Sequence, residues 1–163
     1  MDSTGNLSVN PRFSYVGATW RSNLPGLYIA NTDITYPRQD TYTAGDYMTF
    51  TISQASAIFV YSDVGDIKGQ FSVTVTFTPP PEVGQPVTTI YDAKAHWFSL
   101  DRVLFWAAGM DRDKSYTVKI TNIGTGETPW FSFSHLDVLD ATSVGPAISS
   151  STSLSQSPSV VNC

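Results

Sequence analysis

Short runs in which apolar and polar residues alternate strictly are the feature of this sequence that most restricts its fold. The clearest run is QFSVTVTF at residues 70–77, where Phe and Val alternate with Ser and Thr. Residues 48–53 and 116–121 follow the same pattern. Successive side chains of a β-strand point to opposite faces, so this period of two predicts strands that are buried on one face and solvated on the other.

Two further runs are continuously apolar. Residues 57–61 (AIFVY) and 103–106 (VLFW) are short enough for strands, and their composition predicts burial on both faces. This interpretation places Trp106 in the core. Near the end of the patterned region the alternation changes phase at Ser134-His135, which predicts a bulge or a bend there.

Turn-forming residues separate the runs, and no segment repeats apolar residues at the spacing of an amphipathic helix. The turns are rich in Gly, Asp and Pro and lie at 44–46, 63–69, 79–81, 109–114 and 124–126. The segment TPPPEVGQP at 78–86 is expected to be a long crossover, because proline is excluded from central strands. Many short strands at regular spacing predict an all-β fold, an antiparallel β-sandwich of jelly-roll type.

The composition changes near residue 141. Residues 7–140 are predicted to form the β-sandwich domain, and residues 141–163 are rich in Ser, Thr and Pro without a charged side chain. Such a segment offers too little apolar surface to offset the entropy of ordering, which predicts a flexible stalk or tail. An ordinary disordered C-terminus explains the same composition.

The chain carries few signals of location or of a charged partner. Cys163 is the only cysteine, so no internal disulfide can form. The first residues do not resemble a signal peptide, so the protein is either cytosolic or a trimmed piece of a longer chain. No apolar run approaches the ~18 residues that span a bilayer, so membrane contact would need a segment missing from this chain. The net charge of -5, without a Lys/Arg cluster, argues against a nucleic-acid partner.

The triplet Asp111-Arg112-Asp113 invites a metal-site interpretation. A calcium loop would need a Gly and a later Glu that are missing here, and no nucleotide-binding α/β pattern surrounds the triplet. A hairpin turn is therefore favoured over a metal site. Calcium sites built from scattered acids leave no linear pattern, so a structural calcium stays open, and no other cofactor is expected.

Residues for catalysis are present, but their spacing does not require a catalytic site. His96, Ser99 and Asp101 are close enough in sequence for a Ser-His-Asp site, although a lone His at a strand edge is more often structural. A glycosidase needs paired carboxylates. The candidates lie mostly beside Gly or at predicted turns, where Asp caps the backbone, and they are Asp46, Asp63, Asp66, Asp92, Asp101 and Asp137.

Aromatic residues outside the alternating runs give the stronger functional signal. Trp and Tyr rings stack on the apolar faces of sugars, while acids, amides and Arg bond the hydroxyls. The predicted ligand-binding residues are Trp97, Trp130, Tyr91, Tyr42, Asp101 and Arg21. For Trp97 and Trp130 a role as a lid on the core is an equal alternative, and Trp20 is expected in the core.

Several motifs together resemble one family. YVGATW at 15–20, the strand pair at 45–61 and VLFWAAGMDRDKSYTVKITN at 103–122 resemble galactose-binding-like jelly-roll ectodomains of basidiomycete fungal surface proteins, which are mostly uncharacterised. The resemblance covers about residues 13–141. It implies a cell-surface location and a glycan-binding role. The chain departs from the family pattern at Gly109-Met110, where the family has Gly-Leu, and it lacks the single membrane span that often follows the stalk.

These observations favour a non-catalytic extracellular or cell-surface domain that binds carbohydrate through loop aromatics. An adhesion or sensor ectodomain that contacts proteins is the main alternative. A polysaccharide hydrolase that uses Asp101 and a second carboxylate is a weaker one. The sequence leaves the ligand and the oligomeric state open.

Overall fold

The computed structural model describes residues 11–23, 38–78 and 86–139, and within these ranges it contains strands and turns but no helix. Residues 1–10, 24–37, 79–85 and 140–163, with the proline run and the tail, lie outside the described residues. The described ranges contain eleven strands, which are β1 (Ser14–Val16), β2 (Arg21–Asn23), β3 (Arg38–Thr41), β4 (Tyr47–Ser53), β5 (Ala57–Val64), β6 (Gln70–Thr78), β7 (Val87–Asp92), β8 (Ser99–Ala108), β9 (Ser115–Asn122), β10 (Phe131–Phe133) and β11 (His135–Leu139).

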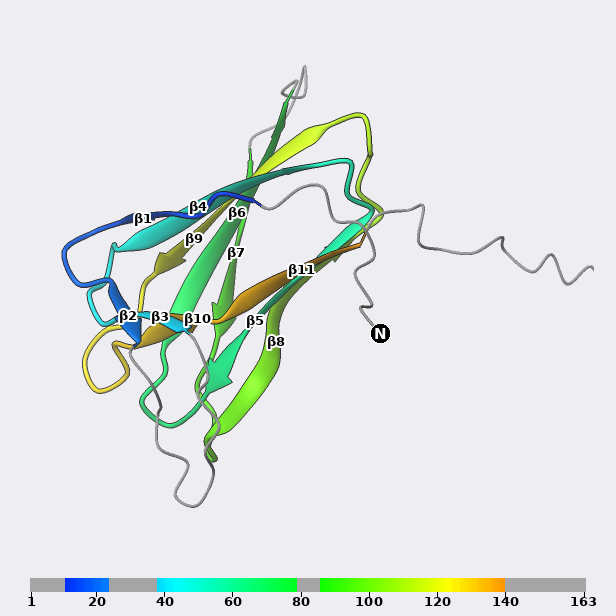
Figure 1. Cartoon of the computed structure of the whole chain (residues 1–163). Coiled ribbons are helices and arrows are strands. Elements are labelled where there is room, and N and C mark those ends of the chain that lie inside the picture. The colour runs from blue at the N-terminus through cyan, green and yellow to red at the C-terminus, as the bar shows by residue number, and fades with distance from the viewer. Residues whose placement is uncertain (1–10, 24–37, 79–85, 140–163) are drawn as a thin grey trace, which may run out of the picture.

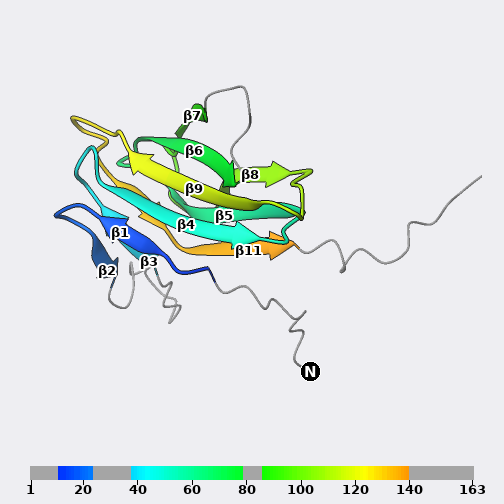
Figure 2. The same cartoon turned by 90° about the horizontal axis from the view of Figure 1, so that it is seen from above.

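The strands pair into antiparallel sheets that lie over one another (Figure 1). The larger sheet has the order β1-β4-β9-β6-β7, and a three-stranded sheet has the order β11-β5-β8. A small sheet, β10-β3-β2, lies at one end. Figure 2 shows β4, β9 and β6 side by side in one layer, with β5 and β11 in the other. The predicted all-β antiparallel architecture is therefore confirmed as a β-sandwich-like arrangement.

The core lies between the two layers and follows the alternation in the sequence. Every second residue of the run in β4 is buried, and the same holds for β9 and for the first half of β6. The opposite layer buries alternate residues of β5, with Phe105 from β8 and Val138 from β11. A fully buried aliphatic or aromatic side chain contributes about 1.5–3 kcal/mol by leaving water, so these matched faces hold the layers together. The central residues are Met48, Phe50, Ile52, Ile58, Val60, Phe71, Val73, Val118 and Ile120.

The apolar run at 103–106 is not buried on both faces, and the core assignment of Trp106 was wrong. The Trp106 side chain is 62% exposed. The reason is the place of β8, which is the last strand in its sheet order and pairs with β5 alone. In the central strand β5 the corresponding run is mostly buried, with Ala57, Ile58 and Val60 covered and the residues between them half-buried.

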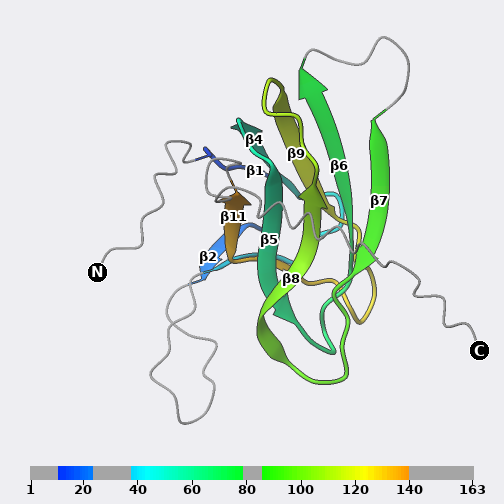
Figure 3. The same ribbon diagram turned by 90° about the vertical axis from the view of Figure 1, so that its right-hand side faces the viewer.

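One prediction about the connections needs refinement and another needs correction. The bulge or bend predicted at Ser134-His135 is the point where the chain passes from one sheet to another, because β10 pairs with β3 and β11 pairs with β5. Ser134 marks the switch, and its N–H donates to the carbonyl of Tyr61. The segment at 78–86 is not a crossover, since β6 and β7 on either side of it are hydrogen-bonded neighbours (Figure 3).

The DxD triplet forms a turn, as predicted, but not a hairpin, because β8 and β9 belong to different sheets and do not pair with each other. Asp111 accepts from the N–H of Asp113 through its Oδ1 at 3.0 Å and from the N–H of Lys114 through its carbonyl. The turn joins β8 to β9. Across the described ranges, no helix is long and apolar enough to cross a membrane.

Candidate functional site

The outward face of the β11-β5-β8 sheet gathers aromatic rings and carboxylates. The strand register places His135, Tyr61 and Val103 in one row, and Asp137, Phe59 and Trp106 in the next. Because side chains two apart share a face, Phe59 and Tyr61 point away from the core that Ile58 and Val60 enter. We call this set the aromatic face, and its members are Phe59, Tyr61, Trp106 and His135 with the carboxylates of Asp101 and Asp137.

The two rings in the first row are stacked. The imidazole of His135 lies 4.4 Å from the phenol ring of Tyr61, with 6° between the planes. The Nε2 of His135 lies 3.6 Å from Oδ1 of Asp101, and its Nδ1 lies 3.2 Å from Oγ of Ser134. Contacts at both ring nitrogens and on the ring face fix the orientation of the imidazole.

Asp101 reaches His135 because β8 bulges at this point. Ser62 pairs with Arg102 and Val64 with Ser99, so Leu100 and Asp101 together oppose the single residue between them in β5. Asp101 has a φ of 56°, in the left-handed region that Asp tolerates better than most residues. Bulges and left-handed residues are concentrated at functional sites, where they redirect a side chain. Here the bulge directs a carboxylate toward the aromatic face.

The electrostatics of the face are acidic. Burial raises the pKa of the Tyr61 phenol above its ordinary value, and the charge of Asp137, a hydrogen bond to Asp137 and the charge of Asp101 raise it further. The phenol therefore stays protonated well above neutral pH and can donate a hydrogen bond. Aromatic surface bordered by hydrogen-bond acceptors is the chemistry that recognises neutral polyhydroxylated ligands.

A second cluster, separate from the aromatic face, contains three of the ligand-binding residues that were predicted from the sequence. The rings of Tyr42 and Trp130 have centroids 5.7 Å apart. Nη2 of Arg21 donates to the hydroxyl of Tyr42 at 2.9 Å, and its guanidinium lies 5.1 Å from the centroid of that ring. Both aromatic residues are half-buried, and Nζ of Lys68 lies 5.9 Å from the centroid of the Trp130 ring. We call Arg21, Tyr42 and Trp130 the Arg21 cluster.

The other predicted residues are dispersed. Tyr91 lies in β7 rather than in a loop, and its ring packs against the core rings of Phe71 and Phe105. Trp97 lies on the connection between β7 and β8 and is 77% exposed. Asp101 belongs to the aromatic face. The ligand-binding roles of these residues stay predictions.

The sequence reasoning missed most of the aromatic face. Trp106 was assigned to the core, and Phe59 and Tyr61 were assigned to a strand buried on both sides. The alternation in β5 was hidden because the residues on both of its faces are apolar. No local signal separates the two faces of β5, because the polar residues that follow in the same strand, Ser62 and Asp63, are themselves buried.

Trp20 packs where it was expected. Its ring contacts Tyr15 at a centroid distance of 4.9 Å and Phe131 at 6.3 Å, and it lies against the core. Its indole Nε1 donates to the carbonyl of Val16 at 3.1 Å.

Asp63 does not lie in a turn, as had been predicted, but at the centre of a buried ionic network. Its Oδ2 lies 2.8 Å from Nη1 of Arg38 and 3.0 Å from Nζ of Lys68. Arg38 also bonds Asp40 at 2.9 Å, and the Lys68 ammonium donates to the hydroxyl of Ser132. Burial would raise the pKa of Asp63, but Lys68 and Arg38 outweigh it and hold the pKa below the usual value.

The carboxyl groups whose pKa values are lowered do not suit acid catalysis. A general acid at neutral pH needs a raised pKa. Burial would raise the pKa of Asp46, but hydrogen bonds from Thr19 and Thr41 lower it below the usual range. The pKa of Asp111 is also lowered, first by the backbone N–H of Asp113.

A serine, a histidine and an aspartate do meet, but only the aspartate, Asp101, belongs to the predicted set. Asp101 lies against His135 rather than His96, and Ser134 contacts the other nitrogen of the ring. The separation of 3.6 Å between His135 and Asp101 is too long for the hydrogen bond that orients the base of a triad. Within residues 11–23, 38–78 and 86–139, no three His, Cys, Asp or Glu side chains gather closely enough to hold a metal ion.

No protein-family model matches this chain, and no curated protein sequence is significantly similar to it.

Proposed function

We propose that this protein is a non-catalytic carbohydrate-binding domain of a cell surface, and that the aromatic face is its binding site. The observation that supports the proposal is the alignment of Trp106 and Phe59 in one row, directly opposite each other in the strand register, with carboxylates bordering them. A row of adjacent rings offers a continuous apolar strip, which suits the C–H face of consecutive sugar units.

The polar border supplies the second half of the recognition. The carboxylates of Asp101 and Asp137 accept hydrogen bonds from hydroxyl groups, and a carboxylate bonds a hydroxyl more strongly than a neutral acceptor does. The Tyr61 hydroxyl donates its hydrogen to Asp137, and its oxygen can accept a hydrogen bond from the ligand. One surface can therefore bind both the apolar ring face and the hydroxyl groups of a sugar.

The charge of the face restricts the class of glycan. The negative charges that raise the pKa of Tyr61 would also repel a carboxylate or a sulfate on the ligand. The net charge of -5 acts in the same direction at longer range. We therefore propose neutral hexose polymers or oligosaccharides as ligands, rather than uronic acids, sialylated glycans or sulfated glycans.

The jelly-roll assignment and the location belong to the same proposal. The resemblance to galactose-binding-like jelly-roll ectodomains supports a surface domain, with residues 141–163 as its stalk. Exposed aromatic binding faces are common to proteins that meet polymeric ligands outside the cell, where a flat site is accessible to long chains.

A glycan array that spans neutral and acidic oligosaccharides tests the proposal. We expect the wild-type protein to bind neutral glycans, and Trp106→Ala to weaken that binding at least tenfold, with Trp97→Ala and Trp130→Ala as matched tryptophan controls. Near-ultraviolet circular dichroism verifies the fold of each variant. Failure of the wild type to bind any glycan, or unchanged binding by folded Trp106→Ala, would contradict the proposal. Loss of binding in Trp97→Ala or Trp130→Ala alone would move the site to the loop aromatics.

One observation favours protein contact as a second function. Ile67, Trp97 and Phe98 are 48%, 77% and 42% exposed and lie at the same end of the sandwich, where Phe98 is next to Gly65. An exposed apolar tip of this kind fits a partner protein or a second copy of the chain. Light scattering across a concentration series, with Trp97→Ser as the comparison, separates self-association from the behaviour of a monomer.

Release of reducing ends from a bound oligosaccharide would instead support the hydrolase alternative.

A further inference from the structure

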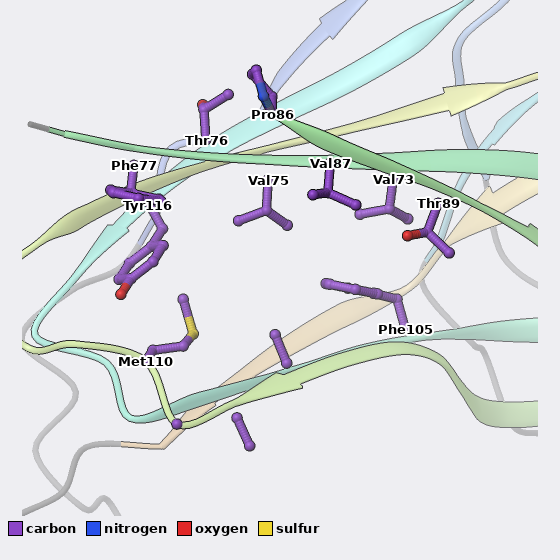
Figure 4. Close-up of a pocket in the computed structure, with 13 residues that line it drawn as sticks. Val73, Val75, Thr76, Phe77, Pro86, Val87, Thr89, Phe105, Met110 and Tyr116 are labelled. Carbon is purple, nitrogen blue, oxygen red and sulfur yellow. The ribbon is translucent and has the colours of Figure 1, made fainter. Parts of the chain in front are cut away.

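An apolar cavity, open to solvent along one side, lies between the two layers of the sandwich, on the opposite side of β8 from the aromatic face. It has a volume of about 520 Å³ and is bounded by β6 and β7 on one side and by β8 on the other (Figure 4). Val75 and Val87 point into it from the first side, and Phe105 forms part of the opposite wall. Its volume falls within the range of about 300–1,000 Å³ that is typical of small-molecule sites.

The cavity exists because the strands that border it carry small side chains. β7 and β8 are each the last strand in their sheet order, so no further strand closes this side of the sandwich. β8 contributes Ala107 and Ala108 here and is followed by Gly109, and these small residues cannot reach across to β7. Farther along the same strands, the rings of Tyr91 and Phe105 meet at 5.7 Å and fill the equivalent space.

The lining residues carry no charge, but one end of the cavity has a cation beside it. Met110, Tyr116 and Phe77 form this end (Figure 4). Nζ of Lys114 lies 5.0 Å from the centroid of the Phe77 ring. Lys114 also pairs with Asp111 at 3.2 Å, but both side chains are more than a third exposed. This ion pair is therefore weak, and Lys114 can bind another anion in place of Asp111.

A second donor lies at the same end. The hydroxyl of Tyr116 accepts a hydrogen bond from the N–H of Asp111 at 2.7 Å, which leaves its own hydrogen to be donated. Tyr116 and Phe77 both line the cavity, and the Lys114 ammonium lies beside Phe77, so the two donors are found at the same end of the apolar space.

We propose that this cavity binds a free fatty acid, with the hydrocarbon chain between β7 and β8 and the carboxylate at Lys114 and Tyr116. An uncharged apolar interior needs a ligand without polar groups along its length, and the cation beside one end needs an anionic head. A fatty acid satisfies both conditions with a single flexible chain. This site is independent of the aromatic face, so glycan binding and fatty-acid binding can fail separately.

Calorimetric titration of the full chain with octanoate, decanoate and dodecanoate, each kept below its micelle concentration, tests the proposal. Each pair of added methylenes should tighten binding about tenfold or more until the cavity is full, since one buried methylene is worth about a fourfold change. In a ¹³C-methyl NMR spectrum, the signals of Met110, Val75 and Val87 should shift on titration. No binding of dodecanoate, or shifts confined to other methyl groups, would overturn the proposal.

Two substitutions test the head-group contact with the cavity intact. Lys114→Gln should weaken dodecanoate binding about five- to tenfold and leave 1-dodecanol unaffected. Asp111→Asn removes the competing carboxylate and should strengthen dodecanoate binding. Equal effects of Lys114→Gln on the acid and on the alcohol would contradict the predicted carboxylate contact. Ala107→Trp fills the cavity and should abolish binding of both ligands, and undiminished binding by this variant, once shown to be folded, would exclude the site.

Discussion

The imidazole of His135 lies parallel to the phenol ring of Tyr61, with 4.4 Å between the ring centroids, and the two residues are directly opposite each other in the pairing of β11 with β5. Asp137 follows two residues after His135 on the same face and hydrogen-bonds Tyr61. The stack therefore places an ionisable phenol between negatively charged neighbours, and its titration reports on the whole aromatic face.

Asp137→Asn should lower the pKa of Tyr61 toward 10.0. Burial and two negative carboxylates raise this pKa in the wild type, and the substitution removes one of the charges. Because the folded value lies above the unfolded one, the stabilising contribution of Tyr61 is present at neutral pH and is lost as the pH rises above 10. Absorbance titration of tyrosinate in the wild type and the variant measures the change. The pKa of Tyr15, raised by burial to about 12, should not change and serves as the internal control.

The free energy of unfolding should decrease as the pH falls below about 4, in part because of Asp46. Its buried carboxylate accepts from Oγ1 of Thr19 and of Thr41 at 2.7 Å, which places its folded pKa below the unfolded value of 3.8. The stabilisation is therefore complete above the unfolded pKa and is lost as the pH falls through the folded one. Thermal melts from pH 2 to 7 should show a flatter profile for Asp46→Asn than for the wild type. Parallel profiles would mean that Asp46 does not contribute.

Gly17→Ala should destabilise the fold by about 3 kcal/mol or more. Gly17 has a φ of 132°, and a Cβ there would lie 1.9 Å from Oδ1 of Asp46, so backbone strain and a clash with a buried carboxylate add together. Gly126→Ala is the matched control, because Gly126 has a φ of 67° with open space around the added carbon. The control should cost about 1–2 kcal/mol from the backbone alone. Urea unfolding of both variants measures the difference, and equal losses would rule out the clash.

Lys68→Met should cost about 3–5 kcal/mol, because it leaves the buried Asp63 with one of its two cations. Lys119→Met is the control on the surface, where the ammonium lies over the ring of Tyr47, and it should cost less than about 1 kcal/mol. The double variant Asp63→Leu with Lys68→Met should cost less than the sum of the two single changes, as measured by denaturant unfolding. Strict additivity would show that the two side chains do not interact.

The strands were predictable because alternation is a local property. The side chains of Phe50, Phe71 and Val118 face the core wherever their strands sit in a sheet, since the period of two alone decides the face. The order of the strands depends on pairings between distant residues, which no local run encodes. Trp106 illustrates the limit: its run is as apolar as that of β5, but β8 lies at an edge and Trp106 is left in water.

The candidate site was less predictable for the same reason. Asp101 was identified, but its partners His135 and Tyr61 lie on other strands, and the bulge that turns it toward them arises from the register of β8 against β5. Asp63 was assigned to a turn because Gly follows it closely, whereas the cations that keep it ionised in the interior, Arg38 and Lys68, are brought to it by the packing of β3 and of the β5–β6 connection.

The position of Ser132 determines when a chain emerging from the ribosome can finish folding. Its hydroxyl joins Lys68 to Asp40, and it is made 64 residues after Lys68. Until β10 and β11 leave the exit tunnel, Lys68 and Asp40 have their ionic partners Asp63 and Arg38 but lack the bridging hydroxyl, and β3 and β5 each lack a neighbouring strand. The buried network is then incompletely covered and incompletely hydrogen-bonded. We expect stalled nascent chains that expose the protein only as far as Gly126 to be cut rapidly by protease, and chains that also expose β10 and β11 to resist digestion.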